Sequence, residues 1–507
     1  QDNYALTDPS TVRKYLVFAD GSRSYFPTRQ PKTVTFTIND KDTSDQYARL
    51  YADDVVNVIN GLMLPRYGMG NYVHASPHDA PSQTEAKMQQ DLSRAGKRLM
   101  GFCRTNLFKR LESSGQAFIQ SIERHILRNY IFLHAIEQRK PLPLGTQDAG
   151  MLDSRIYDED VDDACVTSSM FDDGDEDCAV PTPASLKSEA DFKARAAEIY
   201  REYSTTHKSR FKWLRPDLFI KTLGKDLEND ANSLLKVLKS CGAWDSGKDA
   251  KLNALIDLIT KKHPKEKVIV FTQFADTVRY LEAQFKALHV RQLEGVTGDS
   301  SDPTALAWRF SPVSNEKRDR IKPEDDLRVL IATDVLSEGQ NLQDCAIVVN
   351  YDLPWAIIRL IQRAGRVDRI GQKAENILCY SFLPAEGVER IIRLRSRVRQ
   401  RLQDNAEVVG ADESFFEDDR NDQTILALYH ENAGILDGDA DTEVDLASYA
   451  YQIWKNATTT DPGLQKIIPA LPSVIYSTRE ITSQQGPPGV LVYLRTAEGN
   501  DALAWVD

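Results

Sequence analysis

The strongest constraint on the fold is a series of short, mostly apolar runs between residues 251 and 385. Segments in which apolar residues recur at helical spacing, 252–259 and 276–288, lie among these runs. Apolar strands that alternate with helices are typical of a parallel sheet covered by helices on both faces. We therefore expect an α/β domain here, with strands at 268–271, 329–332, 346–351 and 377–382.

The region before this domain is expected to be mainly helical. Residues 1–43 mix short apolar runs with turn formers, which predicts extended structure and one half-buried strand at 33–38. Residues 44–250 are predicted to form a large helical N-terminal subdomain. Its apolar residues recur at helical spacing in four segments, 44–64, 85–137, 190–203 and 218–238.

Charge is distributed unevenly around a net value of −12. Residues 153–178 carry eleven Asp or Glu against the single Arg155, within a segment, 144–185, that has lost periodicity and is expected to be a mobile insertion. The acidic spacing fits no calcium loop, so we predict no metal site. Residues 353–402 instead carry eleven Lys or Arg against four acids, which is compatible with a polyanionic ligand.

The C-terminal part continues with a basic helix at 386–402 and a mixed α+β region at 403–507, which ends in a predicted hairpin. The chain has no uncharged apolar run long enough to cross a bilayer, so no membrane partner is expected. Its six cysteines show no C-x-x-C spacing, which favours reduced thiols and a cytoplasmic protein.

Polar residues follow the predicted strands directly. Thr272 and Gln273 follow the first strand, the segment 333–342 follows the second, and the segment 352–355, Asp-Leu-Pro-Trp, follows the third. In an open parallel sheet, ligands bind beyond the carboxyl ends of the strands. Each segment alone could be a turn or a helix cap, but together they predict a ligand site at this edge.

Two arginines three residues apart lie in the next segment, 362–372. On a helix, Arg366 and Arg369 would share one face, and their guanidinium groups could meet one polyanionic ligand. The alternative is a solvated basic helix face, which is common.

These segments, in this order, resemble motifs IV, V and VI of the second RecA-like domain of superfamily 2 helicases. The likeness is greatest to the Swi/Snf-related translocases, whose last motif has the form Q-x-x-x-R-x-x-R-I-G-Q, and it covers residues 251–402. The Asp-x-Pro-Trp step and the Gly-Val-Glu step at 387–389 are also similar to that family. Residues 1–43 resemble the linker that leaves the first RecA-like lobe. The last motif is matched here at Gln362, Arg366, Arg369, Ile370, Gly371 and Gln372.

The resemblance implies a motor that hydrolyses ATP with Mg²⁺ between two RecA-like lobes and moves along double-stranded DNA. Arg366 and Arg369 would be arginine fingers on the γ-phosphoryl group, positioned by Gln362. The basic helix around Arg393 and Arg397 would brace the two lobes. Contacts with the nucleotide would come from Gly339, Gln340, Asn341 and Asp368, and contacts with nucleic acid from Thr272, Gln273, Thr333 and Ser337.

One expected part of such a motor has no match. Residues 242–249 read G-x-x-x-x-G-K followed by Asp249, where a phosphate loop needs a hydroxyl for magnesium, and the segment before them is helical instead of extended. We therefore expect that the first lobe, with most ligands of ATP and Mg²⁺, is absent, that region 403–507 is truncated, and that this chain alone hydrolyses essentially no ATP.

Two other interpretations remain open. The chain could be a non-catalytic scaffold whose helical subdomain binds protein partners, although the intact R-x-x-R pair argues against decay. An RNA-directed helicase would carry the same motifs, because these are shared across the superfamily.

Overall fold

The structure is a computed structural model. It describes residues 6–7, 14–17, 21, 23–39, 41–77, 79–144, 188–206, 208–298, 300–334, 341–354, 358–369, 372–384, 393, 420–432, 490–495 and 501–506. The chain divides into two compact units, one formed by Gln1–Leu16 with Ser24–Ser448 and the other by Val17–Arg23 with Tyr449–Asp507. The predicted acidic insertion and the basic helix lie outside the described residues, except for Arg393, which is helical.

A six-stranded parallel sheet forms the centre of the first unit, which confirms the predicted α/β class. The strand order is β4-β11-β10-β7-β9-β8. All four predicted strands are present, as β7, β9, β10 and β11. The strands are β4 (Thr28–Phe36), β7 (Val268–Phe271), β8 (Leu293–Val296), β9 (Val329–Ala332), β10 (Ile347–Asn350) and β11 (Asn376–Pro384).

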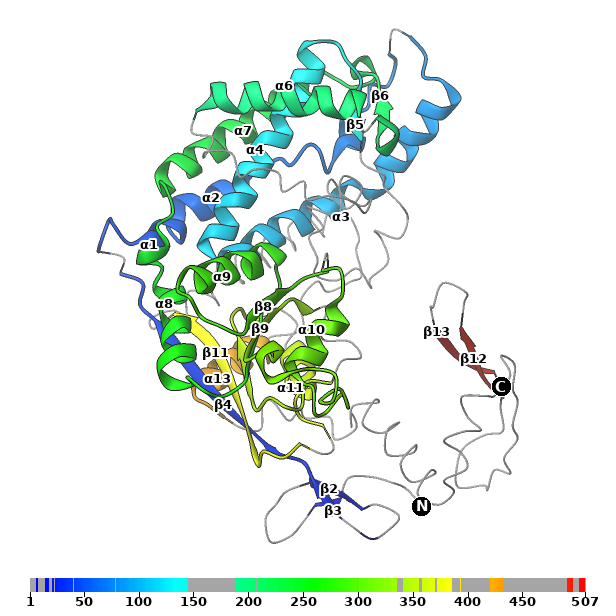
Figure 1. The fold of residues 1–507 in the computed structure, drawn as a ribbon. Coiled ribbons are helices and arrows are strands. Elements are labelled where there is room, and N and C mark those ends of the chain that lie inside the picture. Colours follow the sequence, from blue (N-terminus) through cyan, green and yellow to red (C-terminus); the bar gives the residue numbers. More distant parts are fainter. Residues whose placement is uncertain are drawn as a thin grey trace. The chain divides into compact units, whose positions relative to one another are not determined.

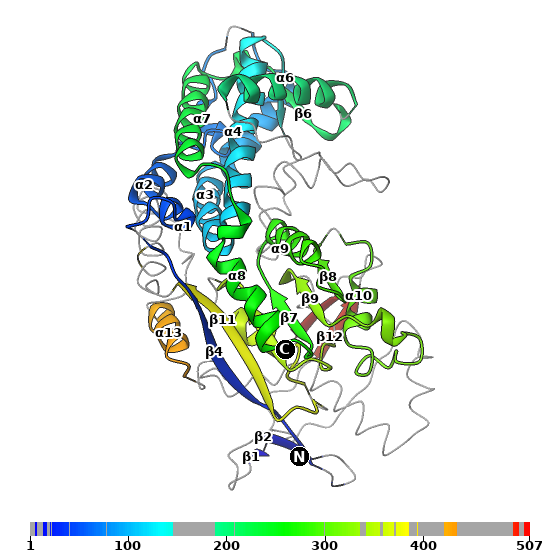
Figure 2. The ribbon, with the colours of Figure 1, turned by 60° about the vertical axis from the view of Figure 1, so that its left-hand side comes forward.

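The two strands at the ends of this order were not expected in the sheet. β4 belongs to the segment predicted to be a linker, yet it pairs with β11 over its whole length, from Thr28 opposite Asn376 to Phe36 opposite Pro384 (Figure 2). Most side chains of β4 are half-buried, and only Pro31 and Phe36 are buried, so the sequence does not indicate the partner of this strand. β8 has the sequence Leu-Glu-Gly-Val and buries only its first and last residues, which gives no clear strand signal.

Each strand supplies alternate residues to two apolar cores, as the side-chain period of a strand requires. On one face, Val268 and Val270 pack with α8 (Ala250–Asp257) and α9 (Ala275–Ala287). On the other face, Ile269 and Phe271 share a core with three further helices. These helices are α10 (Pro303–Phe310), α11 (Ile358–Gly365) and α13 (Arg420–Tyr429).

Helices also dominate the region before the sheet, close to the segments in which helical spacing predicted them (Figure 1). They share a core of their own, apart from the two cores of the sheet. Among the described helices, none is both long enough and apolar enough to cross a membrane. The helices are α1 (Gln46–Leu50), α2 (Asp53–Gly61), α3 (Gln83–Ser113), α4 (Gly115–Glu137), α6 (Glu189–Thr205) and α7 (Thr222–Cys241), accompanied by the antiparallel strands β5 (Leu142–Leu144) and β6 (Lys212–Leu214).

The segment 85–137, predicted as one helical block, is two helices joined at Ser114. This residue has an extended backbone, with φ −154° and ψ 134°, which ends α3 and begins α4. Gly115 follows it, and a Cβ at that position would lie 2.2 Å from the ring of Trp244. The junction therefore needs glycine because another part of the chain packs against its backbone.

The second unit contains the predicted C-terminal hairpin. Strands β12 (Val490–Arg495) and β13 (Asp501–Val506) pair antiparallel, with Val490 opposite Val506.

Three short strands lie near the N-terminus, β1 (Leu6–Thr7), β2 (Lys14–Val17) and β3 (Arg23–Tyr25), and β1 pairs antiparallel with β2.

A buried ion cluster joins the helical region to α9. Arg110 of α3 and Arg124 of α4 both donate to the carboxylate of Asp276, over 2.8 Å and 2.6 Å. Burial pushes the pKa of Asp276 upward, but the two guanidinium groups outweigh burial and hold this pKa well below its ordinary value. Both Arg110 and Asp276 are almost completely buried, so each requires the other.

Replacing Asp276 with Asn should therefore lower the free energy of unfolding by about 3–5 kcal/mol, because Arg110 keeps a buried charge without its counter-charge. Urea unfolding followed by circular dichroism measures this loss. Arg279→Ala is the matched control, since Arg279 is exposed and lies 3.4 Å from the same carboxylate. The control should cost less than about 1 kcal/mol. Equal effects of the two changes would contradict a dominant role for the buried pair.

Candidate functional site

Three neighbouring strands end in polar residues at the carboxyl edge of the sheet. Thr272 follows β7, Asp334 lies two residues beyond β9, and Asp352 lies two residues beyond β10. Since β10, β7 and β9 are adjacent in the sheet, these side chains come close together, as the sequence predicted for the segments after the strands.

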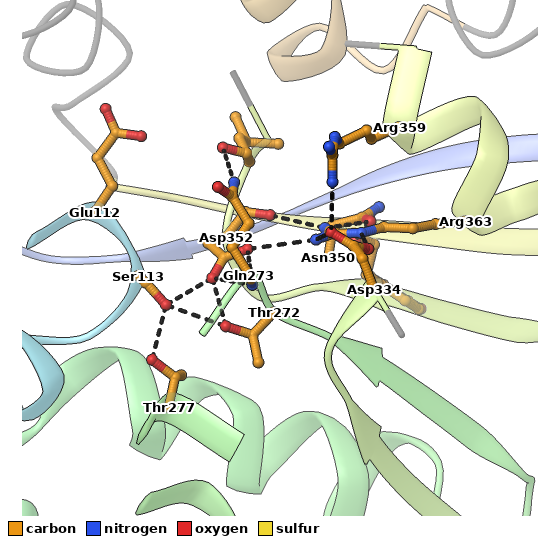
Figure 3. Close-up of polar contacts among 12 residues, drawn as sticks. Glu112, Ser113, Thr272, Gln273, Thr277, Asp334, Asn350, Asp352, Arg359 and Arg363 are labelled. Atoms are coloured by element: carbon orange, nitrogen blue, oxygen red, sulfur yellow. Dashed lines mark hydrogen bonds and ion pairs between the residues drawn. The ribbon is translucent and has the colours of Figure 1, made fainter. Parts of the chain in front are cut away.

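Asp352 is the centre of a buried polar group that we call the Asp352 cluster: Ser113, Thr272, Gln273, Thr277 and Asp352 (Figure 3). The hydroxyl groups of Ser113 and Thr272 donate to Asp352 Oδ2 over 2.6 Å and 2.5 Å. The backbone N–H of Gln273 donates to both carboxylate oxygens. The hydroxyl of Thr277 lies 2.9 Å from Ser113 Oγ and must donate to it, because the proton of Ser113 points to Asp352.

Arg363 of α11 adjoins this cluster and is completely buried. Its guanidinium group donates to both carboxylate oxygens of Asp334, over 2.7 Å and 3.0 Å. It also donates to Asn350 Oδ1 over 3.3 Å and to the main-chain oxygen of Asp352 over 3.2 Å (Figure 3). Arg363 Nη2 lies 3.7 Å from Asp352 Oδ1, so the carboxylate is near Arg363 but is not its main partner.

The two predicted arginine fingers do not lie on a helix face, which corrects the expectation from the sequence. Helix α11 ends at Gly365, and Arg366 and Arg369 lie beyond it, in a segment (366–369) that we call the arginine turn. Glycine weakens a helix by about 1 kcal/mol relative to alanine. The N–H groups of Arg366 and Val367 donate to oxygens three residues back, Arg363 and Ala364, as in a tighter 3-10 turn.

The arginine turn is held by contacts from separate parts of the chain. The N–H of Leu342 donates to the oxygen of Arg366 over 3.2 Å. Gln372 Nε2 donates to the oxygen of Val367 over 3.0 Å and also to two main-chain oxygens of the segment before β10. Asp368 accepts from Arg29 Nε of β4 over 2.7 Å, and both side chains are mostly buried. Arg366 and Arg369 themselves are half-buried.

The predicted nucleic-acid residues Thr272 and Gln273 are buried and bonded within the Asp352 cluster. Neither side chain is exposed in this conformation, and a direct contact with nucleic acid stays a prediction. Thr333 is also buried, and its N–H donates to the oxygen of Val296 over 3.0 Å. Of the remaining predicted residues, Gln362 is exposed on α11, Asn341 is half-buried and donates to Ser314 O, and Ser337, Gly339 and Gln340 lie outside the described residues.

Several residues of this site were missed from the sequence, although some gave a signal. Arg363 lies between Leu360, Ala364 and Val367, which form the buried stripe of α11 and its end. An arginine within an apolar stripe needs a buried acidic partner. Asp334 was available directly after a buried strand. Ser113 gave no such signal, because it lies 239 residues before Asp352.

The segment 242–249 is not a phosphate loop in the structure, in agreement with its unsuitable last residue. Gly242, with φ +69°, ends α7, and Asp249 caps α8 by accepting from the N–H of Leu252. The Asp249 carboxylate also accepts from the hydroxyl groups of Tyr47 and Tyr280. Burial raises its pKa, although these donors act in the opposite direction.

Lys251 is the other unusual buried charge near the Asp352 cluster. Its ammonium group donates to the main-chain oxygens of Glu112 and Ser113, both over 2.7 Å, at the C-terminal end of α3, where a positive charge is favourable. It also lies 4.3 Å from the centroid of the Tyr351 ring. Burial lowers the pKa of Lys251 to about 8, against the attraction of Asp352, Asp249 and Glu112.

Among the described residues, no three His, Cys, Asp or Glu side chains are arranged to hold a metal ion. Arg366 and Arg369, both half-buried, lie in the arginine turn beyond the end of α11.

Comparison with known proteins relates most strands of this sheet, with their polar carboxyl edge, to helicases. Residues 250–371 match the helicase conserved C-terminal domain. An uncharacterized ATP-dependent helicase of Bacillus subtilis, YqhH, is 35% identical over 146 residues, which are 28% of this chain and 23% of that protein. The ATP-dependent RNA helicase DBP8 of Kluyveromyces lactis is 30% identical over 151 residues, 30% of this chain and 32% of that protein.

These matches support a superfamily 2 helicase C-terminal region for residues 250–371, the part of the chain that the family model covers. The chain spans 23% and 32% of the length of the two curated relatives. Among solved structures, the C-terminal part of the Fun30 ATPase domain aligns with 80% of this chain and 100% of that chain. Its sequence identity is 13% and its TM-score is 0.33.

The contribution of Lys251 to the stability of the chain should rise with pH above about 8. The folded state releases this proton near pH 8, whereas the unfolded state keeps it up to 10.5, so the unfolded state binds more protons in between. The free energy of unfolding of the wild type relative to Lys251→Met should therefore increase, by up to about 1.4 kcal/mol per pH unit. Urea unfolding at pH 7.0 to 9.5 measures the difference.

This range ends below the titration of the unfolded tyrosines. Burial raises the pKa of Tyr47 and Tyr351, so these side chains remove stability only above pH 10. Parallel curves for the wild type and Lys251→Met between pH 7.0 and 9.5 would show that Lys251 keeps an ordinary pKa in the folded chain.

Proposed function

We propose that this chain supplies the arginine-finger lobe of a nucleic-acid-dependent ATP hydrolase, a Swi/Snf-related translocase. The observation that carries the proposal is the arginine turn, in which Arg366 and Arg369 follow a helix fixed by the buried Arg363. Catalysis of phosphoryl transfer depends mainly on positioning and on neutralising charge. A turn held by contacts from Arg29, Leu342 and Gln372 would position the two guanidinium groups, and their charge would be available for neutralisation.

Arg366 and Arg369 would contact the γ-phosphoryl group of ATP bound between this lobe and a first RecA-like lobe. The donor set fits this part of the nucleotide, because guanidinium groups bind phosphate oxygens through paired N–H groups. Magnesium would be held elsewhere, since the described residues contain no group of three ligands for it. Bound magnesium supplies charge neutralisation between the phosphates. This chain alone would then bind ATP weakly and hydrolyse essentially none.

The other predicted residues receive more limited roles. We propose that Asn341, which lies beside the Leu342 contact to the arginine turn, and Gly339 and Gln340 approach the nucleotide. Asp368 would act through its ion pair with Arg29, by fixing the turn, and Gln362 would act from the exposed face of α11. Thr333 and Ser337 would couple this region to nucleic acid, and Thr272 and Gln273 would contribute through Asp352.

Arg366→Ala should lower the kcat of nucleic-acid-stimulated ATP hydrolysis by about a thousandfold or more, because an arginine finger stabilises charge that develops in the transition state. The assay requires the polypeptide in which this chain is joined to a first RecA-like lobe. Release of phosphate is measured with saturating nucleic acid. Arg318→Ala is the matched control, since Arg318 lies on the same lobe, is exposed and pairs with Asp326. Undiminished turnover of Arg366→Ala would exclude the finger role.

The preferred nucleic acid is double-stranded DNA in this proposal, on the basis of the Q-x-x-x-R-x-x-R-I-G-Q and Asp-x-Pro-Trp segments. RNA is the second candidate, because three of the relatives are named as RNA helicases. Duplex DNA should stimulate hydrolysis at least about tenfold more than single-stranded DNA or RNA of equal length at 50 mM salt, where phosphate contacts are strong. Greater stimulation by RNA would assign the chain to the second class.

A further inference from the structure

At the junction of α3 and α4, the side chain of Ser113 contacts the polar residues at the carboxyl edge of the sheet. Ser113, the last residue of α3, is completely buried and its hydroxyl donates to Asp352 Oδ2 over 2.6 Å. The same hydroxyl accepts from Thr277 of α9. Lys251 holds the backbone of this junction by donating to the oxygens of Glu112 and Ser113.

Asp352 has two competing types of partner. On one side it accepts from the hydroxyl groups of Ser113 and Thr272 and from the N–H of Gln273. On the other side Arg363 Nη2 lies 3.7 Å from Oδ1, outside hydrogen-bond distance. The neutral donors therefore hold the carboxylate at a distance from the guanidinium group, and Arg363 binds Asp334 instead, over 2.7 Å and 3.0 Å.

We infer that Ser113 is a positioning residue, which determines that Arg363 pairs with Asp334 and thereby fixes the place of the arginine turn. Without the Ser113 hydroxyl, Asp352 Oδ2 loses one of its two short hydrogen bonds from hydroxyl groups. A buried carboxylate that has lost a hydrogen bond is stabilised by turning toward the nearest positive charge. That charge is the guanidinium group of Arg363. Its movement toward Asp352 shifts α11 and the residues that follow Gly365.

The inference gives the helical region a role beyond support of the fold. The position of α3 on the sheet determines whether Ser113 can donate to Asp352. The position of Asp352 in turn affects Arg363, which lies three residues before the arginine turn. As far as catalysis is concerned, this inference rests on the proposed function. The structural coupling itself does not, and it can be measured on this chain alone.

Hydrogen–deuterium exchange of the 507-residue chain tests the coupling. The amides of Arg366, Val367 and Asp368 donate to main-chain oxygens of Arg363 and Ala364, so they report on the attachment of the turn to α11. Ser113→Ala should speed their exchange about tenfold, the loss expected for one hydrogen bond to a charged group. Ser121→Ala is the matched control, a buried serine of α4 outside the Asp352 cluster, and should change these rates less than about twofold.

A second variant tests the same coupling in case Ser113→Ala does not fold. Thr272→Val removes the other hydroxyl donor to Asp352 with nearly the same side-chain shape, and it should speed exchange of the same amides. If exchange of these amides is equally fast in the wild type, Ser113→Ala and Thr272→Val, Ser113 does not position the turn and the inference is wrong.

Hydrolysis by the polypeptide that includes a first lobe separates this inference from the proposed function. Ser113→Ala should lower kcat about fivefold with KM for ATP changed less than about twofold, because the ground-state contacts with ATP are untouched. If exchange is faster while Arg366→Ala keeps full turnover, the proposed function fails and the coupling stands. If Arg366→Ala abolishes turnover while Ser113→Ala changes neither exchange nor kcat, the coupling alone fails.

Discussion

The arrangement of the first unit depends on the buried carboxylate of Asp352. Only 2% of this residue is exposed, so its charge must be compensated inside the protein. The donors come from α3, from the segment after β7 and from the start of α9 through Thr277. A buried polar group is favourable only when all of its members are in place. The helical region, the sheet edge and α11 must therefore assemble together.

A second buried ion cluster joins the same two parts of the chain. Arg110 and Arg124 meet Asp276 at the start of α9, four residues after Thr272 in the sequence. Buried ion pairs contribute little net stability compared with apolar packing, because removing both charges from water is costly. Their effect is to disfavour other arrangements, since a displacement of α3 removes Arg110 from Asp276 and Ser113 from Asp352. The apolar cores supply the stability, and the two acids determine the alignment.

Much of the fold could be predicted from the sequence, because continuous apolar strands and the helices between them leave a clear pattern. The strands β7, β9, β10 and β11 carried that pattern. β4 and β8 could not be placed, since an edge strand has polar residues and its partner is set by distant pairing. For the site, the ends of the strands indicated the correct edge, and an arginine within the buried stripe of α11 could have indicated Arg363. Nothing local marked Ser113, whose partner is determined only by how α3 packs on the sheet.

The end of α11 at Gly365 changes how the two arginines of the proposed finger pair are controlled. On a continuous helix, Arg366 and Arg369 would share a face whatever surrounded them. In a turn, their direction depends on tertiary contacts, and these come from Arg29 of β4, Leu342 and Gln372. β4 precedes the entire helical region in the sequence and forms the edge of the sheet. The position of the arginine turn therefore depends in part on the strand of the sheet that is farthest from it in the sequence, which ties the geometry of the proposed finger residues to the pairing of β4 with β11.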